Sequence, residues 1–145
     1  MPNRTEEWLR DPLLRRMHEA VRAAGPIRPI SVDLTHVCNL RCEGCYYFAE
    51  GMDETPMGDL AALRAFVERE RQRGTNFVTI VGGEPSLELE RLRILYDAFK
   101  LSVATNGVRA TPREGLEDLP IGVAVWGDHE TDKGLRGGGR QPVFA

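Results

Sequence analysis

The chain of 145 residues lacks several features that would assign it to a class at once. It has no apolar run long enough to span a membrane, and its first residues lack the basic and apolar regions of a signal peptide. Its net charge is only −3, and its basic and acidic residues are interspersed, which does not suit a nucleic-acid backbone. These absences predict a cytoplasmic protein with no membrane partner and no nucleic-acid partner.

Cysteine is also scarce, and one short stretch holds all of it. Cys38, Cys42 and Cys45 form the pattern Cys-x3-Cys-x2-Cys and are the only cysteines of the chain. An odd number of clustered cysteines without an export signal argues against a disulfide framework and for metal binding or reactive thiols. Three thiolates at this unequal spacing can hold three corners of a cubane iron–sulfur cluster, which leaves one iron without a protein ligand.

Two other interpretations of the cysteines remain open. Structural zinc takes four ligands, usually as two closely spaced pairs. The fourth would have to be His18, His36 or His129, and none of them has a zinc-like spacing to a second cysteine. Three unligated reactive thiols in a single loop would be unusual. The spacing therefore favours an iron–sulfur cluster.

The hydrophobic pattern predicts an amino-terminal helix followed by alternating strands and helices. Residues 3–24 place one apolar stripe at helical spacing, and we expect that stripe to pack on the rest of the fold rather than on a partner. The alternation predicts a parallel α/β sheet. We divide the chain into an amino-terminal amphipathic helix, residues 1–25, and a core, residues 26–145. The pattern predicts strands at 30–34, 77–81, 101–104 and 121–126, and helices at 60–73, at 87–99 with Ser86 as its cap, and briefly after Pro112.

The residues that suggest chemistry follow the predicted strands. The cysteine loop follows the first strand, Gly82-Gly83-Glu84-Pro85 the second, Thr105-Asn106-Gly107 the third and residues 126–130 the fourth. Because the carboxyl ends of parallel strands meet at one edge of a sheet, we expect these four segments to lie close together. The charged run at 68–73 is expected to be a solvated helical face.

In this combination the chain resembles the radical S-adenosylmethionine (radical SAM) enzymes. Their Cys-x3-Cys-x2-Cys motif follows the first strand of a partial (β/α)6 barrel, a Gly-Gly-Glu-Pro run follows the second, and Thr-Asn-Gly commonly ends the third. The resemblance covers residues 29–145, which is about four βα units at roughly 30 residues each. It implies an α/β fold with a truncated parallel-stranded radical SAM barrel and an amino-terminal helix, and hence an amino-terminal piece of a longer protein.

The resemblance also implies cofactors and their ligands. The three cysteines would ligate a [4Fe–4S] cluster, and its fourth iron would chelate S-adenosylmethionine (SAM). Arg41, inside the loop, would favour the thiolates. In the family an aromatic residue is usual at the position of Gly44. Here Tyr46 and Tyr47 could compensate, although we expect at least one of them to serve packing. A serine is usual at the position of Ala124. The implied SAM-binding residues are Gly44, Gly82, Gly83, Glu84, Thr105 and Asn106.

The implied activity is reductive cleavage of SAM to a 5′-deoxyadenosyl radical, which abstracts hydrogen from an unknown substrate. An electron donor such as a flavodoxin or ferredoxin would be a partner, and no residue is assigned as a general acid or base. The alternatives are an inactive fragment and a non-catalytic module that binds zinc or transfers electrons. A missing carboxyl-terminal half or an oligomer partner would complete the barrel.

Overall fold

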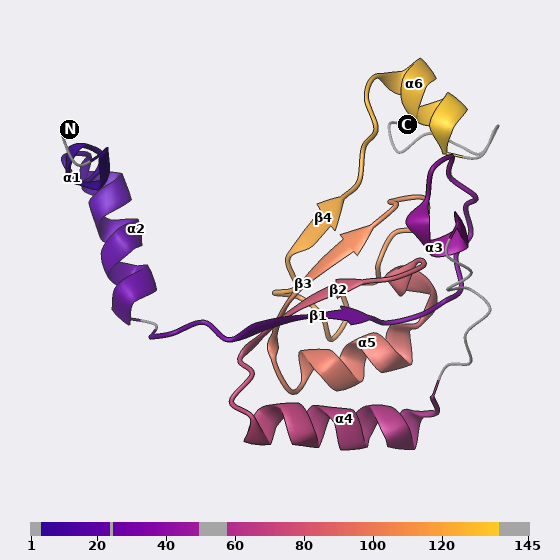
Figure 1. The fold of residues 1–145 in the computed structure, drawn as a ribbon, viewed down its shortest axis with the longest axis horizontal. Coiled ribbons are helices and arrows are strands. Elements are labelled where there is room, and N and C mark those ends of the chain that lie inside the picture. Colours follow the sequence, from indigo (N-terminus) through magenta and orange to yellow (C-terminus); the bar gives the residue numbers. More distant parts are fainter. Residues whose placement is uncertain (1–3, 24, 50–57, 137–145) are drawn as a thin grey trace.

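A four-stranded parallel sheet forms the centre of the fold (Figure 1). The computed structural model describes residues 4–23, 25–49 and 58–136. Spatial order equals chain order, β1-β2-β3-β4, so the α/β fold with a parallel sheet is confirmed. The strands are β1 (Pro29–Asp33), β2 (Phe77–Val81), β3 (Lys100–Thr105) and β4 (Ile121–Val123).

Two helices, α4 (Leu60–Gln72) and α5 (Leu89–Tyr96), cover one face of this sheet (Figure 1). The core lies between them and the strands, where Val78 and Ile80 of β2 and Leu92 of α5 are fully buried. The other face carries small and polar residues and is less covered. Its members are Ser31, Asp33, Thr79, Val81, Ser102 and Ala104, of which none is fully buried.

The ends of α4 follow the expected signals, but its charged run does not. Asp59 caps the helix by accepting a hydrogen bond from Ala62 N–H at 2.8 Å, and Gly74 ends it with a φ of 82°. Within the run expected to be solvated, Glu70 is instead only 5% exposed. Its carboxylate accepts hydrogen bonds from Arg73 and from the Thr75 hydroxyl, both at 3.0 Å. Burial is tolerated because the charge is paired.

The second half of the chain departs from the prediction in its helices. Ser86 does not cap a helix but lies within the short 3-10 helix η2 (Pro85–Leu87), where its N–H donates a hydrogen bond to the Glu84 carboxylate. The residue that directly precedes α5 is Glu88. Residues 106–120 form turns rather than a helix after Pro112. The fourth strand ends at Val123 rather than at residue 126, and a further helix that we did not predict, α6, spans His129–Leu135.

The amino terminus forms two helices, α1 (Arg4–Trp8) and α2 (Pro12–Ala23), so the prediction of one continuous helix is wrong. The break has a local cause: Asp11 accepts hydrogen bonds from Leu13 N–H at 2.7 Å and Leu14 N–H at 3.2 Å, and Pro12 occupies the first helical position. The expected packing is also wrong. No residue of α2 is buried, and Figure 1 shows the helix standing clear of the sheet. None of the helices among the described residues has the length and hydropathy that crossing a bilayer requires.

Removal of residues 1–25 is therefore expected to shift the melting temperature by less than about 3 °C, since no residue of α2 is buried. Pro26 is kept because its carbonyl accepts from Asn76 at 2.9 Å. Circular dichroism melts of the two chains measure the shift. Removal of residues 1–31, which cuts into β1, is the control expected to unfold the protein. A large loss of stability from the shorter deletion would contradict the prediction.

Candidate functional site

The four segments that follow the strands meet at the carboxyl edge of the sheet, as expected. The cysteine loop runs from the end of β1 to α3 (Tyr46–Ala49), and its three thiols line one pocket of about 330 Å³. All the predicted site residues line this pocket except Glu84, which is buried beneath it. The sequence did not single out Val81, Ala104 and Arg136 as lining residues. The lining is Cys38, Cys42, Gly44, Cys45, Tyr46, Val81, Gly82, Gly83, Ala104, Thr105, Asn106, Ala124, Trp126 and Arg136.

The first part of the cysteine loop is fixed by the Gly-Gly turn after β2. Gly83 N–H donates to the Thr35 carbonyl and Glu84 N–H to the Val37 carbonyl, both at 2.8 Å. This close approach requires glycine. A Cβ on Gly82 would lie 2.8 Å from the Thr35 oxygen, and one on Gly83 would lie 2.2 Å from the Val37 oxygen. The two glycines thus have a structural role in the loop that is independent of any ligand.

Glu84 joins the ends of β2 and β3 from below the pocket. Its side chain is fully buried and accepts three hydrogen bonds, from the Thr105 hydroxyl at 2.6 Å, Asn106 N–H at 2.8 Å and Ser86 N–H at 2.9 Å. The Thr105 hydroxyl in turn accepts from Gly107 N–H at 3.1 Å. The Glu84 carboxylate and the Thr105 hydroxyl thus both bond to other groups of the protein, and Glu84 links the ends of β2 and β3.

Cys38 lies among hydrogen-bond donors. The Asn106 amide points to its sulfur at 3.9 Å and also donates to Asn39 at 2.7 Å, while Leu40 N–H reaches the sulfur at 3.5 Å. Burial raises the pKa of the Cys38 thiol, the Leu40 bond lowers it, and the Glu84 carboxylate raises it. Since burial has the largest effect, a metal that binds here must displace a proton.

Arg136 is the cation in the lining of the pocket, whereas Arg41, which the sequence singled out, is not among the lining residues. Burial raises the pKa of the Cys42 thiol, and the charge of Arg136 opposes that shift. Arg136 and its partner Asp132 are almost fully buried in and just after α6, with an N–O distance of 3.3 Å. Their spacing of four residues was visible in the sequence. Their burial was not, because it depends on the packing of α6 against the cysteine loop.

Aromatic residues reach the pocket from two sides. Tyr46 and Trp126 both line it, whereas Tyr47 is 1% exposed and packs edge-on against Tyr46 with ring centroids 5.5 Å apart. This agrees with the expectation that one of the two tyrosines serves packing. Ala124 also lines the pocket and offers no hydroxyl. His129, at the start of α6, is not among the lining residues.

The donor set fits a cluster that takes three thiolates, each on its own iron. The three thiols line the same pocket and influence one another electrostatically, with amide donors at Cys38 and the charge of a guanidinium acting on Cys42. Hydrogen-bond donors and charges beside a metal-bound sulfur orient it and tune its electron density. Within residues 4–23, 25–49 and 58–136, no three His, Cys, Asp or Glu side chains are arranged to hold one metal ion.

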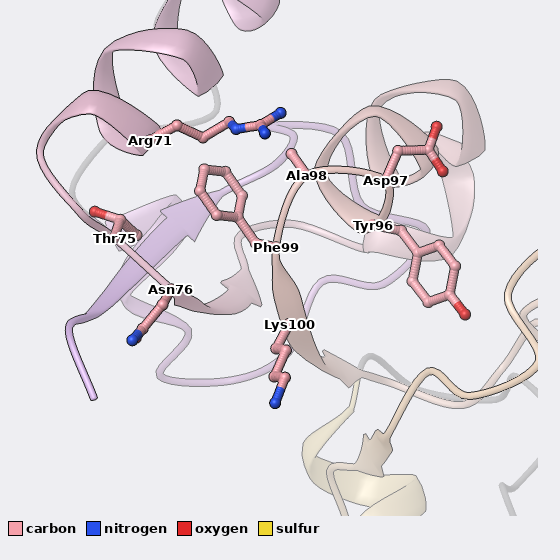
Figure 2. Close-up of a pocket in the computed structure, with 8 residues that line it drawn as sticks. All are labelled: Arg71, Thr75, Asn76, Tyr96, Asp97, Ala98, Phe99 and Lys100. Carbon is pink, nitrogen blue, oxygen red and sulfur yellow. The ribbon is translucent and has the colours of Figure 1, made fainter. Parts of the chain in front are cut away.

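Another pocket, of about 430 Å³, lies at the opposite edge of the sheet, near the starts of β2 and β3 (Figure 2). Its charged groups are of both signs, and it has no cysteine or histidine in its lining. None of the sequence motifs reaches it, so the candidate site is the cysteine pocket. The lining of this other pocket is Arg71, Thr75, Asn76, Tyr96, Asp97, Ala98, Phe99 and Lys100.

Comparison with known proteins gives one distant relationship. No family model matches the chain, and no solved structure matches it. The chain is 26% identical over 131 residues to molybdenum cofactor biosynthesis protein 1 of Drosophila melanogaster, in an alignment that covers 80% of this chain. It spans only 23% of the length of that relative. The chain is therefore a distant homologue of a small part of a cofactor-biosynthesis protein.

Proposed function

We propose that the chain binds a [4Fe–4S] cluster through Cys38, Cys42 and Cys45 and binds SAM beside it, as part of a radical SAM enzyme. One observation carries the proposal: three thiols of one loop share a pocket with the Gly-Gly turn of β2 and with Thr105-Asn106 of β3. Distant homology to a cofactor-biosynthesis protein supports an enzymatic role. The substrate of that relative is not transferred to this chain, which covers less than a quarter of it.

The residues of the pocket have distinct tasks in this proposal. When bound, the reduced cluster would supply the electron that cleaves SAM to methionine and a 5′-deoxyadenosyl radical, which removes hydrogen from a substrate. Asn106 and Leu40 N–H stabilise negative charge on the Cys38 sulfur, and Arg136 stabilises it at Cys42. Tyr46 and Trp126 line the pocket together with Gly44, and we propose that one of their rings stacks on the adenine base.

The surroundings of the pocket suggest the remaining partners. The less covered sheet face, with Ser31, Thr79 and Ser102, is where a substrate would approach. We propose that a carboxyl-terminal half or a second subunit supplies the rest of the barrel wall beside β4, because Val123 at the end of β4 and Val125 just after it are 44% and 43% exposed. A flavodoxin or ferredoxin is the proposed electron donor.

Anaerobic reconstitution with iron and sulfide tests cluster binding. We expect about four irons and four sulfides per chain, with charge-transfer absorption in the visible range. Replacement of any one cysteine by alanine is expected to lower the iron content by more than half, because three thiolates hold the cluster. His129→Ala is the matched control and should keep full iron content, since His129 lies outside the pocket. Stoichiometric zinc that depends on His18, His36 or His129 would contradict the cluster assignment.

A cluster module that does not cleave SAM is the second candidate. It is favoured by the Thr105 hydroxyl, which is committed to Glu84, and by Ala124, which has no hydroxyl for a ribose. Incubation of the reconstituted protein with dithionite and SAM separates the two candidates. Release of 5′-deoxyadenosine supports the radical SAM assignment. A full cluster without this product, and with a spectrum unaffected by SAM, would support electron transfer instead.

A further inference from the structure

Arg136 is a buried cation at the point where the segments of the site meet. Its side chain is 5% exposed, and both carboxylate oxygens of Asp132 lie 3.3 Å from one of its nitrogens. The same guanidinium donates to the Ala124 carbonyl at 3.0 Å and to the Asn106 carbonyl. One side chain therefore joins α6 to the segments that follow β3 and β4. The planar fork of an arginine, with several donors in fixed directions, suits this position and an ammonium group does not.

Asp132 fixes that guanidinium in place. Its carboxylate is 4% exposed, and besides Arg136 it accepts a hydrogen bond from Trp126 N–H at 2.9 Å. The carboxylate is thus tied to the backbone of the segment after β4 on one side and to Arg136 on the other. A buried pair with this many additional hydrogen bonds holds a single geometry.

The cysteine loop is attached to the same point. The positive charge of Arg136 opposes the rise that burial causes in the pKa of the Cys42 thiol, and both residues line the pocket. The next residue of the loop, Glu43, donates its N–H to the Leu135 carbonyl at 2.7 Å. Leu135, the last residue of α6, thus holds the loop directly after Cys42, and the next residue, Arg136, shares the pocket with that cysteine. Figure 1 shows α6 above the end of β4, on the side of the cysteine loop.

We propose that Arg136, held by Asp132, is a positioning residue that fixes the middle of the cysteine loop and offsets negative charge on the Cys42 sulfur. The charge part rests on the proposed function, because it requires a bound cluster. The positioning part does not, since the contacts exist in the protein alone. A fixed positive charge beside an anionic cluster favours its reduced form, which carries one more negative charge.

Hydrogen–deuterium exchange of the metal-free chain tests the positioning. Arg136→Gln removes the positive charge and most of the hydrogen-bond donors of the guanidinium. We expect the Glu43 amide to exchange at least about tenfold faster, because the Leu135 carbonyl that accepts its hydrogen bond is no longer held in place. Arg136→Lys keeps the charge but not the fork, and should show similar acceleration. Glu70→Gln is the matched control, because it alters a paired, buried carboxylate remote from the cysteines. It should leave exchange at Glu43 unchanged. Unchanged exchange in both Arg136 variants would overturn the positioning role.

The midpoint potential of the reconstituted cluster tests the proposed effect of the Arg136 charge. The couple is the one-electron reduction of the cluster by dithionite. Arg136→Gln should lower the reduction equilibrium constant about tenfold, which is a shift of about 59 mV to more negative potential. Arg136→Lys should restore most of the wild-type potential while exchange at Glu43 stays fast. Equal potentials in the wild type and Arg136→Gln would overturn the charge role.

The outcomes also separate this inference from the proposed function. A wild-type chain that takes up no cluster refutes the proposed function and the charge role together, and the exchange experiment still decides the positioning. Should Arg136→Gln not fold, Arg136→Lys and Asp132→Asn replace it. Both must then accelerate exchange at Glu43, and the absence of any acceleration refutes the inference.

Discussion

Replacement of Glu84 by alanine is expected to lower the free energy of unfolding by about 3–5 kcal/mol. The carboxylate is fully buried and accepts from Thr105, Asn106 and Ser86, so its loss leaves three donors without a partner in the interior. A buried donor without a partner costs about 1–3 kcal/mol. Because a domain of this size has roughly 5–15 kcal/mol of stability in all, a large part of it depends on this one side chain.

Urea or thermal unfolding of the metal-free chain, followed by circular dichroism, measures the effect of Glu84→Ala without any contribution from a cofactor. Glu84→Gln should have an intermediate effect, because its amide keeps only one acceptor oxygen. Glu90→Ala is the control: Glu90 is exposed on α5, and its loss should change stability by no more than about 0.5 kcal/mol. A Glu84→Ala protein that unfolds like the wild type would show that the crosslink between β2 and β3 is dispensable.

The sheet and the gathering of the motifs could be predicted from the sequence because both follow from local patterns. Residues 77–81 form a short apolar run, and β2 occupies the same residues. The rule for carboxyl ends of parallel strands then places the cysteines, Gly83 and Thr105 together, as the structure does. As ligands of a cluster and of SAM, these residues remain predictions.

The rest of the site could not be predicted because it depends on contacts between distant segments. Arg136 contacts the backbone of residue 106, thirty positions earlier, and no local pattern distinguishes it from an exposed arginine on a helix. Glu70 is similar, since its burial depends on how the end of α4 meets the sheet. The break after α1 is different. An aspartate followed by proline is a signal for a helix start, and Asp11-Pro12 provides it here. The apolar stripe continues through this position at regular helical spacing, and for that reason it predicts one helix instead of two.

Replacement of Gly83 by alanine is expected to destabilise the protein by about 3 kcal/mol, the upper end of the usual cost of overpacking. A Cβ there would lie 2.2 Å from the carbonyl oxygen and 2.7 Å from the carbonyl carbon of Val37. These are backbone atoms, which cannot move away by rotating a side chain. Relief requires a shift of the loop that carries Cys38, and it would break the hydrogen bond from Glu84 N–H to the Val37 carbonyl.

The same substitution should therefore affect both stability and metal uptake. We expect Gly83→Ala to melt about 10 °C lower than the wild type and to lose more than half of its reconstituted iron, because displacement of Val37 also displaces Cys38.

Gly134→Ala is the matched control. A Cβ on Gly134 meets nothing within 4 Å, and alanine favours the helix by about 0.5–1 kcal/mol, so this variant should be slightly more stable. A Gly83→Ala protein with wild-type melting and iron content would show that the close approach of the glycine turn to the loop does not set the position of the cysteines. A protein that melts lower but binds full iron would confine the effect of the glycine to folding.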